Sequence, residues 1–149
     1  EGMVAEGRKA FEIIGKQTVL KIPATQVGFA VVACLSPEIT CSVTAIYSAA
    51  QAAVAREAGA KIAIAYVNRA TRLLGDGIAL VRDMASVLAL SDTEILAASI
   101  KSPEEAAASL QAGAHHLTLP LPMLQDMATH EFSDKTVEEF AKNGIGLKI

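Results

Sequence analysis

A lysine interrupts an otherwise apolar run near the start of the chain. Lys21 lies between Leu20 and Ile22 in a stretch of aliphatic and β-branched residues that is typical of a strand. Because side chains alternate faces along a strand, Lys21 would lie on the face opposite to Leu20 and Ile22. An amine that loses hydration in an apolar interior can attack a carbonyl and form a Schiff base. The alternative is an ordinary lysine whose ammonium reaches solvent at the end of a strand.

Four further apolar runs also end in polar or ionisable residues. The residues at these ends, or just beyond them, are Ser42, Thr44, Tyr66, Arg69, Ser99, Lys101 and Thr118. Each one alone is commonly a hydrogen-bonded strand terminus. Together with Lys21 they would gather an amine, a phenol, hydroxyls and two cations on one face, which predicts an active site. Arg69, Ser99 and Lys101 could hold a phosphate, because a guanidinium offers a fork of donors and an ammonium a point charge.

The elements that would position these residues alternate between short β-branched runs and alanine-rich helical stretches. The sequence predicts strands at residues 18–22, 40–46, 61–67, 94–99 and 116–119. It predicts helices at residues 2–14, 26–35, 48–58, 78–90, 103–112, 122–129 and 136–143, with a loop over residues 68–77. Ser102, Pro103 and Glu105 form a helix-start pattern, and Gly59 is placed to end a helix. Alternating strands and helices imply a parallel sheet in an α/β fold.

Two α/β architectures fit five such units. Five strands would complete an open doubly wound sheet, whereas a (β/α)8 TIM barrel would need three more. The first helix has no strand before it, and the sequence begins Glu1-Gly2-Met3, which favours part of a barrel. We therefore expect one partial TIM-barrel domain over residues 1–149 that contains about the last five strands.

Composition excludes several classes of protein. The chain has 149 residues, of which 52% are hydrophobic and 19% charged, enough apolar content to exclude disorder. A net charge of −3 gives no electrostatic footprint for nucleic acid. No apolar run approaches about 18 residues, so we expect no membrane span, and no signal peptide is visible. Cys34 and Cys41 are too few for a disulfide framework; we expect two buried, reduced thiols and a cytoplasmic location.

Motifs for metals and nucleotides are missing from the sequence. No G-x-G-x-x-G or Walker loop follows any predicted strand. The glycines at residues 75 and 77 indicate a turn rather than a phosphate cradle. His115 and His116 lack a third ligand at metal-binding spacing. We therefore expect neither a metal nor an organic cofactor.

Five ordered sequence blocks carry a family resemblance. They are VLKIPAT at residues 19–25, TAIYSAAQ at 44–51, YVNR at 66–69, LAAS at 96–99 and TLPL at 118–121. In this order they resemble the small transaldolase family, which includes fructose-6-phosphate aldolase, over about residues 1–140. The resemblance implies a (β/α)8 barrel and a class I aldolase or transaldolase that acts on ketose phosphates of the pentose phosphate pathway. It also implies a homo-oligomer whose C-terminal helix packs on a neighbouring subunit.

The resemblance implies a role for each candidate residue. Lys21 would be the Schiff-base lysine, and Thr44 the threonine that positions a catalytic water. Tyr66 matches the tyrosine of the aldolase branch, where transaldolases usually have phenylalanine. Arg69 and Ser99 match phosphate-binding positions. Lys101 stands where members of the family often have a second basic residue that helps to bind the phosphate.

The sequence also departs from the family pattern. Ser42 stands where transaldolases have asparagine. The acidic residue of the family's first strand is not in this chain. The chain is therefore expected either to be a class I aldolase or transaldolase, with Tyr66 favouring the aldolase, or to be a barrel that binds sugar phosphates without turning them over. A homo-oligomer would use Phe132, Val137 and Phe140, which could equally be an intramolecular helix face.

Overall fold

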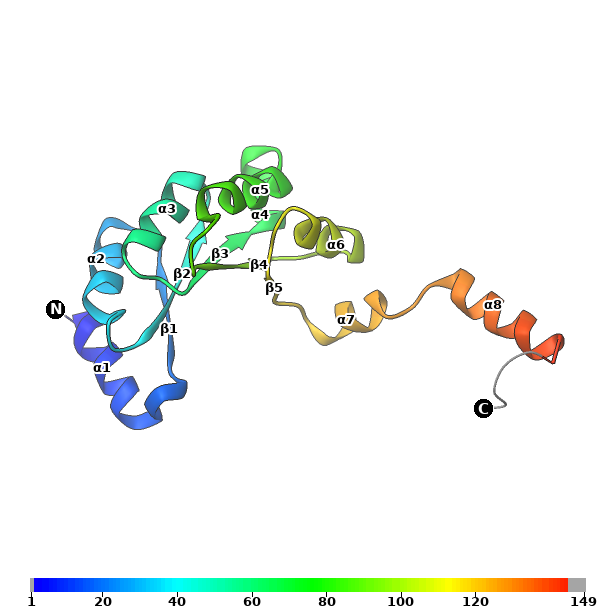
Figure 1. Ribbon diagram of the computed structural model, residues 1–149, viewed down its shortest axis with the longest axis horizontal. Helices are drawn as coiled ribbons and strands as arrows, with labels where there is room; N and C mark the ends of the chain where they lie inside the picture. Colours follow the sequence, from blue (N-terminus) through cyan, green and yellow to red (C-terminus); the bar gives the residue numbers. More distant parts are fainter. Residues whose placement is uncertain (1, 145–149) are drawn as a thin grey trace. The chain divides into compact units, whose positions relative to one another are not determined.

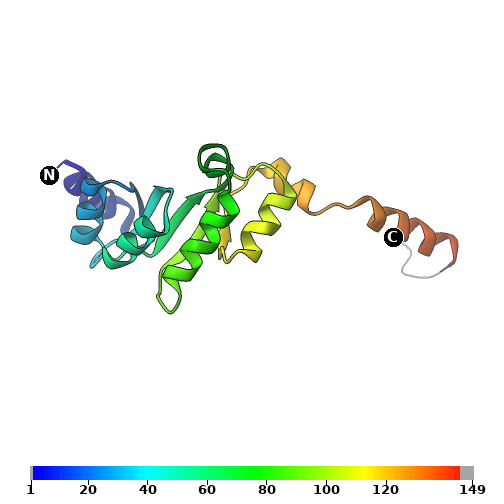
Figure 2. The ribbon, with the colours of Figure 1, turned by 90° about the horizontal axis from the view of Figure 1, so that it is seen from above.

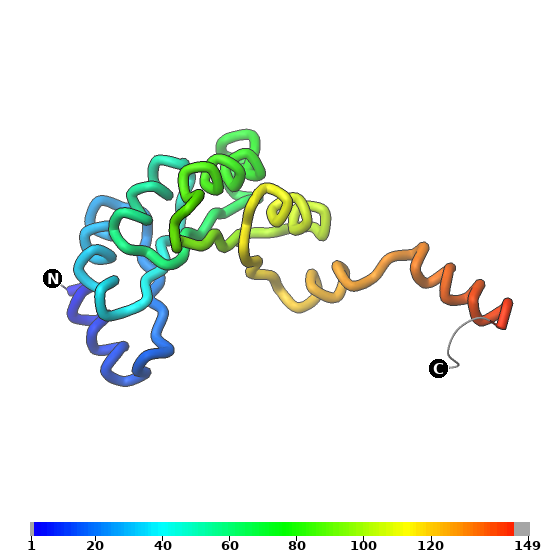
Figure 3. The backbone as a smooth tube through the Cα atoms, viewed as in Figure 1, coloured from blue at the N-terminus to red at the C-terminus, as the bar shows by residue number. Residues whose placement is uncertain are grey.

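The computed structural model describes residues 2–144 as two compact units that meet in the chain after Thr118. The first unit contains a parallel sheet of five strands in the order β1-β2-β3-β4-β5. The strands are β1 (Val19–Pro23), β2 (Thr40–Ile46), β3 (Ile62–Tyr66), β4 (Glu94–Ala98) and β5 (His116–Leu117). Its helices are α1 (Gly2–Ile14), the short 3-10 helix η1 (Gly15–Gln17), α2 (Gln26–Leu35), α3 (Ala49–Glu57), α4 (Val67–Leu74), α5 (Gly77–Leu88) and α6 (Pro103–Gln111). Figure 1 shows these elements, and Figure 3 follows the backbone between them.

The strand order decides between the two predicted architectures. A doubly wound sheet reverses its order and carries helices on both faces. Here each strand pairs with the next one along the chain, and α2, α3, α5 and α6 form one layer in which each helix contacts the next. Figures 1 and 2 show this layer along one face of the sheet. The fold is therefore α/β with the winding of the C-terminal part of a TIM barrel, as expected.

The core lies between the sheet and this helix layer. Alternate strand residues such as Ile22, Val43 and Ile95 are buried there, whereas Lys21 on the opposite face of β1 is exposed. The large side chains with almost no exposed surface are Val32, Leu35, Ile39, Val43, Ile46, Val67, Val81, Met84 and Ile95. These aliphatic side chains account for the low aromatic content, since close helix–sheet packing needs no large rings.

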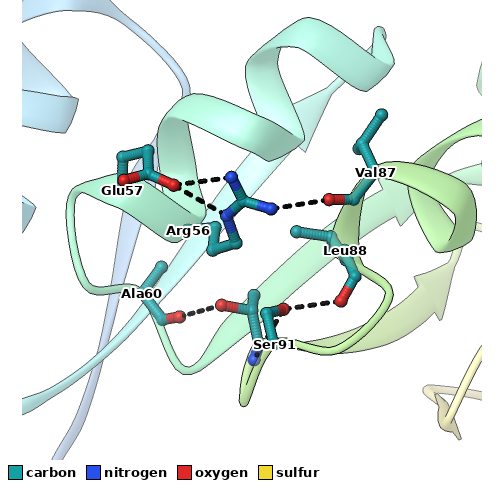
Figure 4. A network of polar contacts seen from close by, with 7 residues as sticks. Arg56, Glu57, Ala60, Val87, Leu88 and Ser91 are labelled. Atoms are coloured by element: carbon teal, nitrogen blue, oxygen red, sulfur yellow. Dashed lines mark hydrogen bonds and ion pairs between the residues drawn. The ribbon is translucent and has the colours of Figure 1, made fainter.

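A group of polar contacts lies near the amino ends of the strands. The Arg56 guanidinium donates to the Glu57 carboxylate at 2.6 and 2.8 Å and to the Val87 carbonyl at 2.8 Å. Nearby, the buried Thr93 hydroxyl donates to the Ala60 carbonyl at 2.8 Å. Figure 4 shows the contact of Arg56 with Val87, which joins the end of α3 to the end of α5. The network fixes two helices at the edge opposite to Lys21.

The predicted loop at residues 68–77 is wrong, because most of it is helix α4. Val67 and Ala70 are fully buried on one side of this helix, while Arg69 and Arg72 are exposed on the other. The high density of polar residues hid this short amphipathic pattern. Gly75, with a φ of 98°, ends α4, and the Asp76 carboxylate caps α5 by accepting a hydrogen bond from the Ala79 N–H at 2.8 Å.

Two smaller predictions also differ from the structure. Strand β5 ends at Leu117 rather than at residue 119, although the Thr118 N–H still donates to the Ala97 carbonyl. Cys34 is exposed, since it lies on the outer side of α2, whereas Cys41 is buried as expected. Neither cysteine forms a disulfide. Glu1 and residues 145–149 of the expected 1–149 domain lie outside the described residues.

The second unit contains helices α7 (Leu121–Met127) and α8 (Glu131–Lys142). Helix α8 begins five residues before the predicted start, because the ring of His130 caps it by accepting a hydrogen bond from the Phe132 N–H at 3.2 Å. Phe132, Val137 and Phe140 recur on one side of α8 and are exposed. Across the described part of the chain, no helix is both long enough and apolar enough to cross a membrane.

Candidate functional site

The carboxyl ends of the parallel strands lie along one edge of the sheet and carry the predicted site residues. The register pairs Lys21 of β1 with Ser42 of β2, and Pro23 with Thr44. The Ala24 N–H then donates to the Thr44 carbonyl at 2.8 Å, so β1 and β2 stay joined to their ends. On β3, Tyr66 pairs with Ala98 of β4. The strands themselves therefore bring Lys21, Thr44 and Tyr66 to the same edge of the sheet, and no long loop is needed to position them.

Tyr66 is the residue around which the others gather. The Lys21 Nζ lies 5.9 Å from the centroid of the Tyr66 ring. The Arg69 guanidinium carbon lies 5.0 Å from the same centroid. The Thr44 hydroxyl donates a hydrogen bond to the Tyr66 hydroxyl at 3.3 Å. Three predicted site residues thus surround a fourth, and the two cations lie at distances at which they are attracted to the face of its ring.

These neighbours change the acidity of the phenol. The hydrogen bond from Thr44 favours the phenolate and lowers the pKa of Tyr66 below its ordinary value. The positive charges of Lys21 and Arg69 act in the same direction, while partial burial opposes them. A more acidic phenol is better suited to exchanging protons with a substrate or a water molecule near neutral pH.

A bulge in β2 shapes this part of the site. The pairing of β2 with β3 shifts register between Val43 and Ile46, and Ala45 has a φ of 59°. A left-handed conformation is uncommon for alanine and indicates local strain that the surrounding structure maintains. Bulges re-aim side chains at the edges of sheets. Here Thr44 lies directly before the strained residue and reaches across to Tyr66.

Lys21 itself is exposed, as in the alternative of an ordinary lysine whose ammonium reaches solvent at the end of a strand. Within the first unit, β1 packs against β2 and α2. The predicted face is confirmed, since Ile22 is buried beneath the helices. Ser42, the partner of Lys21 in the strand register, is buried, and its hydroxyl donates to the Leu20 carbonyl at 3.1 Å. Its contact is structural, joining β1 to β2.

The predicted phosphate-binding residues come from two adjoining segments. Arg69 lies in the first turn of α4, and Lys101 precedes α6; both side chains are exposed. Ser99, directly after β4, is partly exposed and has a φ of 62°. Its carbonyl accepts a hydrogen bond from the Asn68 N–H at 3.2 Å, which joins the two segments. Hydrogen-bond donors for an anion are thus available both from the start of α4 and from the segment between β4 and α6.

Gln51 is a site-supporting residue that sequence reasoning missed. Its side-chain oxygen accepts a hydrogen bond from the Tyr47 N–H at 2.9 Å, and its side-chain nitrogen donates to the Ala24 carbonyl at 3.3 Å. Gln51 therefore connects the chain just after β1 with the chain just after β2. The signal in the sequence was Ser48, whose hydroxyl caps α3 three residues before Gln51, as in a capping box.

The remaining candidates stay apart from this cluster. His116 lies beside Glu94, with 3.0 Å between its Nε2 and the carboxylate, and Thr118 is exposed after β5. In the part of the chain that the structure describes, no three His, Cys, Asp or Glu side chains are placed to hold a metal ion.

Comparison with known families matches residues 1–147 to the family described as transaldolase/fructose-6-phosphate aldolase. The chain belongs to this family. A relative from Clostridium acetobutylicum, named probable transaldolase, is 39% identical over 146 residues. A second, from Symbiobacterium thermophilum and of the same name, is 37% identical over 146 residues. Each alignment covers 96% of this chain and 67% of the relative.

Membership of the transaldolase/fructose-6-phosphate aldolase family confirms the resemblance that the five sequence blocks predicted. It also identifies the chain as an enzyme of transaldolase or aldolase type.

Proposed function

We propose that this chain carries the Schiff-base and phosphate-binding parts of a class I aldolase acting on ketose phosphates. The observation that carries the proposal is the Tyr66 ring, with Lys21 and Arg69 near its face and Thr44 on its hydroxyl. This arrangement brings one primary amine, one phenol and one guanidinium close together at the carboxyl ends of the strands.

The first step uses Lys21 as the nucleophile. Its deprotonated amine attacks the ketose carbonyl to form a carbinolamine. The carbinolamine takes up one proton, supplied by Tyr66 or by a water molecule, and loses one water molecule, which leaves an iminium that links the Lys21 nitrogen to carbon 2 of the sugar. The iminium accepts the electron pair of the C3–C4 bond as that bond breaks, and an enamine forms. The proton of the C4 hydroxyl passes to a water molecule held by Thr44 and Tyr66, and an aldehyde phosphate leaves.

The phosphate group sets the position of the reacting bond. Arg69, Ser99 and Lys101 would bind the phosphate at the far end of the sugar, with Arg69 able to donate two parallel hydrogen bonds. Since Arg69 also lies beside Tyr66, a bound phosphate would hold the sugar chain across the ring toward Lys21. Such fixed placement contributes to rate by reducing the entropy lost on reaching the transition state.

The fate of the enamine separates two activities. In a transaldolase it attacks a second aldehyde phosphate, whereas in an aldolase it takes a proton at C3 and is hydrolysed to free dihydroxyacetone. We propose that the aldolase reaction is favoured, because the hydroxyl of Tyr66 can hold the water that supplies this proton. Measuring both reactions on one preparation tests this. Release of dihydroxyacetone without an acceptor supports it, and strict dependence on an acceptor aldehyde contradicts it.

We further propose that the chain forms a homo-oligomer in a reducing compartment. The apolar stripe of Phe132, Val137 and Phe140 on α8 would pack against a second copy of the chain in a homo-oligomer. Free thiols at Cys34 and Cys41 suit a reducing cytoplasm, where pentose phosphate sugars would be available. Light scattering of the purified protein tests the oligomer, since a monomeric mass would contradict it.

A further inference from the structure

A carboxylate lies between the two segments that carry the proposed phosphate-binding residues. Glu105 is in the first turn of α6 and is partly buried. One of its oxygens accepts a hydrogen bond from the Lys101 N–H at 2.7 Å. The other accepts one from the side-chain amide of Asn68 at 3.3 Å. Both oxygens of this single carboxylate are therefore used, each by a different segment.

The backbone of Glu105 is held by hydrogen bonds on both of its polar groups. The Glu105 N–H donates to the Ser102 hydroxyl at 3.1 Å, which is the cap of α6. The Glu105 carbonyl accepts a hydrogen bond from the Ser109 hydroxyl at 2.7 Å. The capped helix start thus fixes the point from which the side chain extends, and the Lys101 N–H and the Asn68 amide hold its carboxylate.

The two partners of Glu105 are direct neighbours of the cations. Asn68 precedes Arg69 in the first turn of α4, and Lys101 is itself the second basic residue. The Asn68 N–H also donates to the Ser99 carbonyl at 3.2 Å. Glu105 and this backbone hydrogen bond therefore form two parallel connections between the segments, one through a side chain and one through the main chain.

The negative charge of Glu105 is unexpected between two segments that are proposed to bind a phosphate. A carboxylate near a bound phosphate weakens phosphate binding through like-charge repulsion. We propose that Glu105 is a positioning residue that sets the spacing of Arg69 and Lys101 for the phosphate of the sugar. This inference rests on the proposed function of Arg69, Ser99 and Lys101. It adds a specific device by which this chain would select phosphorylated over unphosphorylated substrates.

The test compares a phosphorylated with an unphosphorylated aldehyde, glyceraldehyde 3-phosphate and glyceraldehyde, as partners of the same donor. We expect Glu105→Ala to raise the KM for glyceraldehyde 3-phosphate about tenfold. The KM for glyceraldehyde and the kcat with either aldehyde should stay within about twofold, because the atoms around Lys21 are not touched. The matched control is Glu104→Ala, which removes the neighbouring carboxylate and should leave both KM values unchanged.

Two further variants keep the test decisive if Glu105→Ala does not fold. Glu105→Gln can accept from the Lys101 N–H and pair with a turned Asn68 amide, so its KM for glyceraldehyde 3-phosphate should stay close to the native value. Glu105→Asp keeps the charge but is one methylene too short to reach both donors, so its KM for that aldehyde should rise. A role of charge alone would leave the KM of Glu105→Asp for glyceraldehyde 3-phosphate at the native value and would lower that of Glu105→Gln, because only Gln removes the repulsive charge; that result would overturn the inference.

The remaining outcomes separate this inference from the proposed function. If Arg69→Ala loses discrimination between the two aldehydes and neither Glu105→Ala nor Glu105→Asp does, the positioning role is wrong and the phosphate site stands. If the variants of Glu105 affect both aldehydes equally, the residue only supports folding. If the native enzyme does not discriminate at all, the phosphate site itself is wrong, and the inference fails with it.

Discussion

The Thr44 hydroxyl donates a hydrogen bond to the Tyr66 hydroxyl across 3.3 Å, although the two residues lie on different strands and 22 positions apart. This contact joins the group proposed to position a water molecule to the group proposed to move its proton. It depends on the bulge after Thr44, where Ala45 takes a left-handed conformation. The chemistry proposed for the chain is therefore tied to an irregular feature of β2.

Replacing Tyr66 with phenylalanine should shift the balance of the two reactions. The Tyr66→Phe variant keeps the ring beside Lys21 and Arg69 but loses the hydroxyl, so protonation of the enamine should slow by roughly a hundredfold. Transfer to an aldehyde phosphate does not need that proton and should persist. The measurement is the ratio of dihydroxyacetone release to transfer.

The control is Tyr47→Phe, which changes the other tyrosine of the chain and should leave this ratio unchanged. An unchanged ratio in Tyr66→Phe would remove the argument for the aldolase reaction.

Removing the Thr44 hydroxyl should make Tyr66 a weaker acid. In the native chain the Thr44 hydrogen bond is the largest cause that lowers the pKa of Tyr66, so Thr44→Val should raise that pKa toward the ordinary value of about 10. Ultraviolet titration of tyrosinate, with Tyr66→Phe used to identify the signal, measures the change. An identical titration in the native and Thr44→Val proteins would show that the hydrogen bond does not act on the phenol.

The same shift has a consequence for stability. Because the pKa of Tyr66 is lower in the folded state, ionised Tyr66 favours folding. This contribution is fully present above the unfolded value of about 10 and is lost as the pH falls through the lowered pKa. Urea unfolding across this alkaline window should show a smaller rise of stability with pH in Thr44→Val than in the native protein. Equal slopes would contradict the prediction.

Gly77 should not tolerate a side chain. A Cβ at this position would fall on the Val67 carbonyl oxygen and lie 2.8 Å from the Thr71 hydroxyl, so α4 and α5 would have to separate. We expect Gly77→Ala to lower the free energy of unfolding by roughly 1–3 kcal/mol. Gly2→Ala, where nothing lies within 4 Å, is the matched control in denaturant unfolding. Native-like stability of Gly77→Ala would mean that the two helices do not pack as described.

The regular elements of the fold were predictable because each has a local cause. Helix α2 and strand β2 have the predicted bounds, since their apolar patterns are continuous, and Ser102 caps α6 as its pattern indicates. Helix α4 was missed because tertiary burial of only two residues, Val67 and Ala70, stabilises it. Patterns that short are not distinguishable from loops by periodicity.

The candidate site was predictable in position but not in detail. Strand ends and alternation placed Lys21, Thr44 and Tyr66 on one edge, because parallel strands share their direction. The bulge at Ala45 and the left-handed Ser99 left no signal, since neither residue is a glycine. Gln51 and Glu105 act through contacts with segments 27 and 37 residues away, which no local pattern contains.

Trapping the covalent intermediate on Lys21 tests the proposed Schiff base most directly. The purified enzyme is incubated with dihydroxyacetone and borohydride, which reduces an iminium to a stable amine, and the modified peptide is located by mass spectrometry. We predict that the adduct lies on Lys21, that Lys21→Arg forms none, and that the control Lys16→Arg forms it normally. An active enzyme that gains no mass at Lys21, or gains it at another lysine, would contradict the account.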